Sequence, residues 1–144
     1  NYKETLRKAL FELLELKGNG TEARLFEFRS RGYFLVDAIK CRCEKKNGQP
    51  PESVTKTCSR KWLTPELEEI GFASRICVLG KAALLALSQV KGFEGLLRYS
   101  VIRDCGKVIW AEGREVLIWP FLGWRNERHY LPKIPMFKRF CCVN

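Results

Sequence analysis

Seven cysteines and a single histidine are the residues of this 144-residue chain best suited to chemistry. With only His129, a zinc site built from several imidazoles is excluded, and a Ser-His-Asp arrangement would depend on that one residue. Cys41 and Cys43 flank a loop and Cys58 opens a helix, so these three thiols could converge on one soft metal ion or cluster. The remaining cysteines are Cys77, Cys105, Cys141 and Cys142.

Asp37 is the one charge in an otherwise apolar run from Tyr33 to Ile39. A run of this length and hydrophobicity predicts a strand that is buried on both faces. A carboxylate there costs several kcal/mol unless something compensates it, so Asp37 predicts either a structural partner or a ligand. The chain contains no GxGxxG, P-loop or HExxH motif, and therefore gives no support for nucleotide hydrolysis or zinc-peptidase chemistry.

These side chains must be positioned by helices and strands that the pattern of apolar residues predicts. Leucines at helical spacing predict a helix over 2–16, and a charged connector (24–31) leads to the strand at 33–39. After a loop at 41–51, a helix is expected over 52–70 with a break at Thr64-Pro65. Further predicted elements are a strand at 76–79, a helix at 81–89, and strands at 107–111 and 115–119 about a Glu112-Gly113 turn.

Strands that alternate with helices predict an α/β fold, a three-layer αβα sandwich with a central, mostly parallel sheet. No linker divides the chain, so residues 1–144 are expected to form one domain. The first residue is Asn1 rather than methionine, which leaves open a longer natural chain. No window reaches the roughly 18 uninterrupted apolar residues of a membrane span, and no secretory signal precedes the first helix, so we expect an intracellular protein.

The net charge of +10 is distributed unevenly. Residues 1–72 hold 14 Lys/Arg against 11 Asp/Glu, whereas residues 73–144 hold 12 against 5. Aromatic residues are interleaved in this basic half, a combination that suits a phosphate backbone with stacked bases. The alternative is a solvated basic surface around core aromatics. The aromatics concerned are Trp110, Trp119, Phe121, Trp124, Tyr130 and Phe137.

The order of motifs resembles the uracil-DNA glycosylase superfamily, especially its iron–sulfur branch. The matching segments span about residues 2–130. They are Tyr33 to Arg42, Pro51-Glu52, Cys58, Leu67-Glu68, Val78 to Ala83 and Val116 to Pro120. The family's first strand and the loop that positions the attacking water have no counterpart in this chain.

The resemblance implies roles for several residues. Asp37 looks like the family's base-reading Asn and Trp119 like its catalytic His, while Phe121 would line the base pocket. Asp37 would favour base edges that present donors, since an ionised Asp only accepts hydrogen bonds. Trp119 would leave an indole N–H and a stacking face where an imidazole is expected. Cys41 and Cys58 look like two ligands of a 4Fe-4S cluster in the full-length protein.

The function expected from this resemblance is DNA binding with base flipping and N-glycosidic removal of a damaged or deaminated base. The alternative is a catalytically silent module that binds nucleic acid or a partner protein on the same fold. A plain structural α/β protein with a basic surface is a third interpretation. The residues expected to contact DNA are Lys40, Arg42, Lys81, Arg125, Arg128, His129 and Lys133.

Overall fold

The computed structural model describes residues 2–71 and 73–142, which form two compact units. The first unit combines both ends of the chain, residues 1–36 and 121–144, and the second contains residues 37–120. The expectation of a single domain over 1–144 stays a prediction. Within the part of the chain that is described, no helix has the length and hydropathy needed to cross a membrane.

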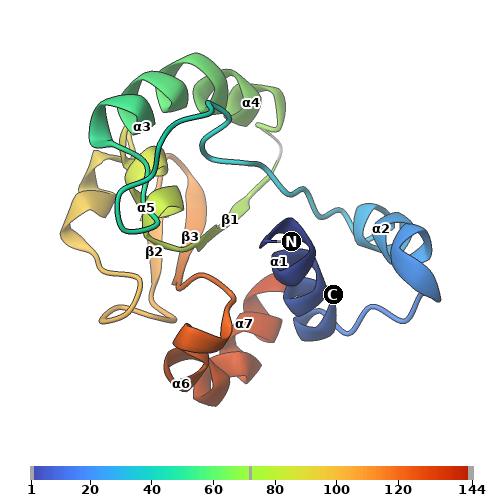
Figure 1. The fold of residues 1–144 in the computed structure, drawn as a ribbon. Helices are drawn as coiled ribbons and strands as arrows, with labels where there is room; N and C mark the ends of the chain where they lie inside the picture. Colours follow the sequence, from blue (N-terminus) through green and yellow to red (C-terminus); the bar gives the residue numbers. More distant parts are fainter. Residues whose placement is uncertain (1, 72, 143–144) are drawn as a thin grey trace. The chain divides into compact units, whose positions relative to one another are not determined.

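The second unit is a small α/β fold around an open three-stranded sheet of order β1-β3-β2 (Figure 1). β1 (Arg75–Leu79) runs parallel to β3 (Arg114–Trp119), whereas β2 (Val108–Ala111) pairs with β3 in the antiparallel direction. The sheet is therefore mixed rather than mostly parallel. The reason is local, because a two-residue turn can join only antiparallel neighbours.

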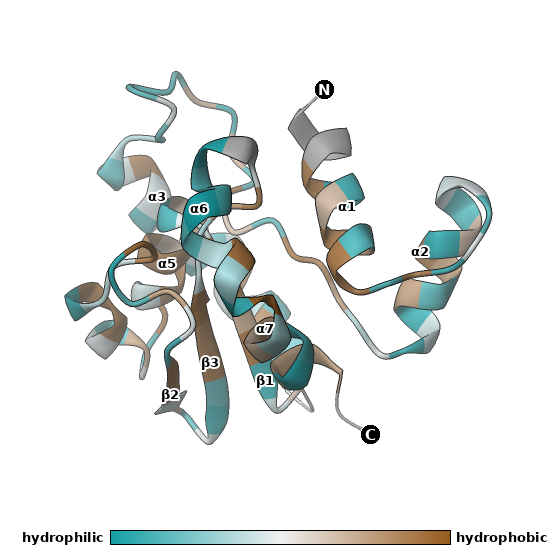
Figure 2. Ribbon diagram, turned by 90° about the horizontal axis from the view of Figure 1, so that it is seen from below, coloured by the Kyte–Doolittle hydropathy of each residue, from teal (hydrophilic) through white to brown (hydrophobic). Residues whose placement is uncertain are grey.

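The hairpin β2–β3 confirms the predicted strands and the turn between them. Glu112 and Gly113 both have positive φ, 51° and 70°, as a type I′ turn requires. The second half of β3 is fully buried in the core of the sheet. Figure 2 shows this part of the strand in the colour of hydrophobic residues.

The predicted strand–helix unit is also confirmed. β1 leads through Gly80 into α5 (Lys81–Ser88), which packs against β1 (Figure 1). Gly80 has φ 100° and ψ 166°, a conformation that is essentially restricted to glycine, and its N–H donates to the Trp119 carbonyl at 2.9 Å. The turn between β1 and α5 is thereby attached to the end of β3.

The helical region before β1 is interrupted close to the predicted position. α3 (Glu52–Cys58) is followed by a π-helical turn (Ser59–Leu63) and by α4 (Thr64–Glu69). Pro65 lacks an N–H for the carbonyl one turn earlier, which accounts for a wider turn at this point. The Ser59 hydroxyl donates to the Ala86 carbonyl at 2.5 Å and fixes this turn to α5.

Two predictions for the first 40 residues are wrong. Residues 33–39 form no strand: the segment has no ladder partner, and Phe34 and Leu35 are 57% and 52% exposed. The expected connector at 24–31 is instead helical as far as residue 30, as part of α2 (Gly20–Ser30). The apolar run suggested burial, but a strand also needs a neighbour to satisfy its N–H and C=O groups.

The first unit is helical. α1 (Tyr2–Leu13) confirms the first predicted helix, although it ends three residues early, and Glu15 then takes a positive φ of 53°. Aromatic rings join the unit's core: the Phe28 ring lies 6.0 Å from Phe11 and 5.1 Å from Tyr33 between centroids. The C-terminal part forms α6 (Glu127–Tyr130) and α7 (Ile134–Cys141), with short 3₁₀ turns at Trp124–Asn126 and Leu131–Lys133.

Candidate functional site

The two residues predicted to be catalytic lie in different environments from those expected. Asp37 is exposed and belongs to an irregular segment, so it is not a carboxylate buried in a strand. Trp119 is fully buried at the end of β3, where its ring fills the core. Phe121 is half-buried and belongs to the first unit, whereas Asp37 belongs to the second. A base pocket lined by both residues therefore stays a prediction.

The residues predicted to contact DNA are divided between the two units. Lys40, Arg42 and Lys81 belong to the second unit, and all three are exposed. In the first unit, Arg125 and Arg128 are exposed, whereas His129 and Lys133 are half-buried. The Arg128 side chain donates from Nε to His129 Nε2 at 3.2 Å.

Cys41 and Cys58, predicted on the basis of the resemblance, do lie together in the second unit. The Cys58 sulfur is 0% exposed and accepts the backbone N–H groups of Lys40 and Cys41, at 3.1 and 3.2 Å. The Lys40 side chain forms an ion pair with Glu66 on α4. The irregular segment that carries residues 40 and 41 is thus attached to the helical region 52–69.

The two thiols differ in acidity. Burial opposes ionisation of Cys58, but hydrogen bonds from the Cys41 thiol and from the backbone N–H groups of Cys41 and Lys40 outweigh it, so the pKa of Cys58 is lowered. The same thiol–thiol hydrogen bond raises the pKa of Cys41, and partial burial adds to this effect. Cys58 is therefore the more acidic member of the pair.

Two thiols supply half of the ligands that a four-iron cluster requires. Within residues 2–71 and 73–142, no group of three or more His, Cys, Asp or Glu side chains is arranged to hold a metal ion. The described residues therefore do not make a complete cluster site, and the predicted convergence of Cys43 with Cys41 and Cys58 on one metal is not observed. A cluster in a longer chain stays a prediction.

A second group of chemically distinctive residues lies where the 3₁₀ turn η2 (Glu94–Arg98) leads toward β2. The Arg98 guanidinium lies 5.6 Å from the centroid of the Tyr99 ring, and the Lys107 ammonium lies 5.2 Å from it. Both distances are in the range of cation–π attraction. Two exposed cations are thereby held beside one half-buried aromatic ring.

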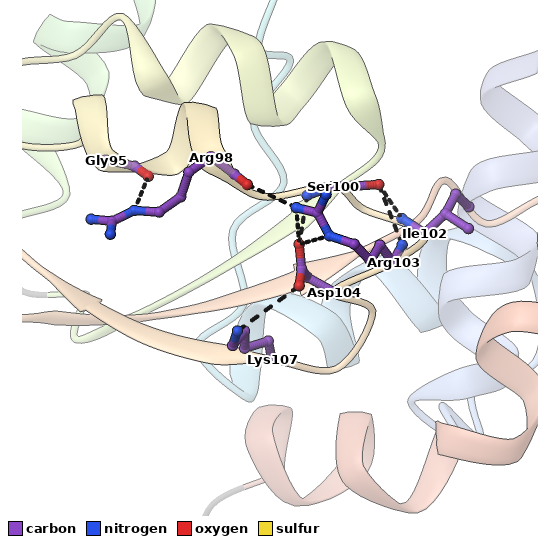
Figure 3. Close-up of polar contacts among 7 residues, drawn as sticks. All are labelled: Gly95, Arg98, Ser100, Ile102, Arg103, Asp104 and Lys107. Atoms are coloured by element: carbon purple, nitrogen blue, oxygen red, sulfur yellow. Dashed lines mark hydrogen bonds and ion pairs between the residues drawn. The ribbon is translucent and has the colours of Figure 1, made fainter.

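Asp104 organises the backbone around these cations (Figure 3). Its carboxylate accepts the Ser100 N–H at 2.8 Å and the Arg103 guanidinium at 2.9 Å, and Lys107 lies 3.9 Å away. Arg103 also donates to the Arg98 carbonyl at 2.8 Å. The Ser100 hydrogen bond and then those of Arg103 lower the pKa of Asp104, which stays ionised and holds the segment 98–107 in one conformation.

Trp110 extends this region along β2. β2 is an edge strand, and the Trp110 side chain is 72% exposed. We refer to the exposed cations and the aromatic rings of residues 98–110 as the edge surface. Its members are Arg98, Tyr99, Arg103, Lys107 and Trp110.

Sequence reasoning missed most of the edge surface. Among the interleaved aromatics, it did not separate exposed Trp110 from Trp119, Tyr130 and Phe137, which are all core residues. The contact of Tyr99 with Lys107 depends on how residues 100–106 fold back, which neither periodicity nor composition reports. The one available signal was the spacing of cationic and aromatic residues between 98 and 110.

Comparison of the chain with models of known protein families, with curated proteins and with solved structures gave no match. The similarity to the uracil-DNA glycosylase superfamily consequently stays a prediction. The function proposed below rests on the geometry of the chain's own residues.

Proposed function

We propose that the protein is a module that binds single-stranded DNA, with the edge surface as its contact region. The observation that carries this proposal is the placement of Arg98 and Lys107 beside the Tyr99 ring, in a segment that leads into β2, where Trp110 is exposed. Such a surface combines the two components that bind unpaired nucleic acid: cations for phosphates and flat rings for bases.

Phosphate contacts would come from the exposed cations of the edge surface. Arg98 and Lys107 project beside a ring, and Arg103 is positioned by Asp104. Between residues 98 and 110, three cations and one carboxylate give a net charge of +2. A preorganised set of cations loses less conformational entropy on binding than mobile side chains would.

Base contacts would come from Trp110. An indole that is 72% exposed on an edge strand presents a face to solvent without any rearrangement of the core. Unpaired bases expose the faces that can stack on such a ring, whereas bases inside a duplex are already stacked on one another. This difference favours single strands as the ligand.

This proposal takes the binding alternative rather than base excision. Asp37 is exposed on an irregular segment and Trp119 lies within the core, so neither supports a pocket that encloses one base. N-glycosidic cleavage stays a prediction that rests on the resemblance alone. The three-layer arrangement of that family likewise stays a prediction beside the small mixed sheet.

Replacing Trp110 tests the proposal directly. We expect Trp110→Ala to weaken binding of a fluorescent oligothymidylate by about 1–3 kcal/mol, roughly 5- to 150-fold in Kd, because one stacked base is lost. The measurement is fluorescence anisotropy at low salt. Thermal stability should hardly change, since the side chain is exposed.

The matched control is Phe26→Ala, which removes a 74% exposed aromatic ring from α2 in the other unit. Its affinity should equal that of the wild type. A duplex of the same length should bind more weakly than the single strand. Equal affinity of the wild type and Trp110→Ala would refute the stacking role.

A further inference from the structure

Cys41 and Cys58 are the two side chains whose geometry the proposed function leaves unexplained. They are 17 positions apart in the chain, yet the Cys41 N–H donates to the Cys58 sulfur at 3.2 Å, and the Lys40 N–H donates to it at 3.1 Å. A cysteine that merely fills the core does not require two backbone donors.

Covalent geometry places the two sulfurs within reach of a bond. The Cys41 side chain branches one bond from the nitrogen that already donates to the Cys58 sulfur, so its Cβ atom lies near that sulfur. A disulfide needs neighbouring Cβ atoms and a rotation of the side chains, not a rearrangement of distant backbone. The irregular segment around residue 41, which has no strand partner, can absorb a small adjustment.

The two thiols also differ in access. Cys41 is half-buried, whereas Cys58 is 0% exposed. An external reagent would therefore reach Cys41 first, and Cys58 would react only with a sulfur attached to Cys41. Cys41 would thus be the thiol that reacts with the reagent, and Cys58 the buried resolving thiol that completes the disulfide.

We propose that Cys41 and Cys58 form a reversible redox pair that a low-molecular-weight disulfide, such as glutathione disulfide, oxidises to an intramolecular disulfide. Cys41 reacts first because it is accessible: its thiol loses its proton as it attacks one sulfur of the reagent, the S–S bond of the reagent breaks, and the first glutathione leaves with that proton. The Cys58 thiolate then attacks the Cys41 sulfur and releases the second glutathione. Two protein thiols are oxidised, and one glutathione disulfide is reduced to two glutathiones.

The disulfide would join the segment that carries Lys40 and Arg42 covalently to α3. It closes a loop from residue 41 to residue 58, which includes the exposed turn at Asn47-Gly48. The ratio of oxidised to reduced glutathione then determines how tightly this segment is held. This inference does not depend on the proposed DNA binding.

The test equilibrates the whole chain in glutathione mixtures from fully reduced to fully oxidised. The samples are quenched in acid, alkylated and digested without reduction, and the peptides are identified by mass spectrometry. We expect the alkylated forms of Cys41 and Cys58 to disappear together and a peptide pair joined through these two residues to replace them. Cys43→Ser, which removes a half-buried thiol two positions away, should give the same result.

Cys58→Ser should stop the reaction halfway, so that Cys41 accumulates as its glutathione adduct. If this variant does not fold, the alkylated and disulfide-linked peptides of the wild type decide alone. The proposal is overturned if Cys41 and Cys58 remain separately alkylated over the whole range of mixtures. It is equally overturned if Cys58 pairs with Cys43 as readily as with Cys41.

Discussion

Asp104 is the residue on which the conformation of the edge surface depends most. It accepts a backbone N–H from Ser100 and two nitrogens of Arg103, and its own N–H donates to the Ser100 carbonyl at 2.8 Å. An exposed ion pair alone would contribute little to stability. The backbone hydrogen bonds add a constraint that salt screens less, so the loss of this carboxylate should loosen residues 98–107.

Replacing Asp104 by Asn should therefore lower stability in a pH-dependent way. The folded pKa lies below that of the unfolded chain, about 4, so the carboxylate stabilises the fold above that pH. This stabilisation is lost as the pH falls through the lowered pKa. We expect urea unfolding to show a less stable Asp104→Asn protein at pH 7 and a shrinking difference toward pH 3.

Glu44→Gln is the matched control for this experiment, since Glu44 is an exposed carboxylate on the loop before α3. Its stability should follow that of the wild type over the whole pH range. A difference between wild type and Asp104→Asn that stays constant with pH would show that the ionised carboxylate is not responsible.

The elements that the sequence predicted best are those with local causes. The Glu112-Gly113 turn needs only two residues that accept positive φ, and the strand–glycine–helix unit at 75–88 needs only an apolar run and a turn. The prediction of a strand at 33–39 was wrong because an apolar run does not show whether a neighbouring strand is present to pair with it. α2 was missed because its apolar residues do not form one face: Phe26 is exposed while Phe28 is buried.

Gly80 connects the sheet to α5, and its replacement tests how strictly this connection depends on glycine. We expect Gly80→Ala to lower the free energy of unfolding by about 1–3 kcal/mol, because its φ of 100° and ψ of 166° are unfavourable for any residue with a Cβ atom. Gly95→Ala is the control: the added Cβ meets only the flexible end of Arg98. Equal denaturation midpoints for the two variants would contradict this expectation.

The candidate site could be predicted in part. Cys41 and Cys58 were identified from the order of motifs, and the structure brings them together. The exposure of Asp37 follows from the absence of a strand at 33–39, whereas Trp119 ends a strand that was predicted and is buried there. The edge surface depends on contacts across a loop, and such contacts are fixed only by the folded chain.

The whole molecule carries its positive charge on both units. Residues 37–120 hold 14 Lys/Arg against 10 Asp/Glu, and the remaining residues hold 12 against 6. Charge alone would therefore attract DNA to either unit. In the edge surface two cations, Arg98 and Lys107, lie beside one ring, that of Tyr99, so its contribution can be separated from general attraction by neutralising both.

The dependence of oligothymidylate affinity on salt is the most direct test of this account. A plot of log K against log salt reports the number of phosphates contacted, with a slope of about 0.7 per contact for single strands. For Arg98→Gln/Lys107→Gln we predict a slope about 1.4 units shallower than that of the wild type, because two contacts are lost. Lys8→Gln/Arg29→Gln, an equal loss of exposed charge in the first unit, should leave the slope unchanged. An identical slope for the wild type and Arg98→Gln/Lys107→Gln would contradict binding through the edge surface.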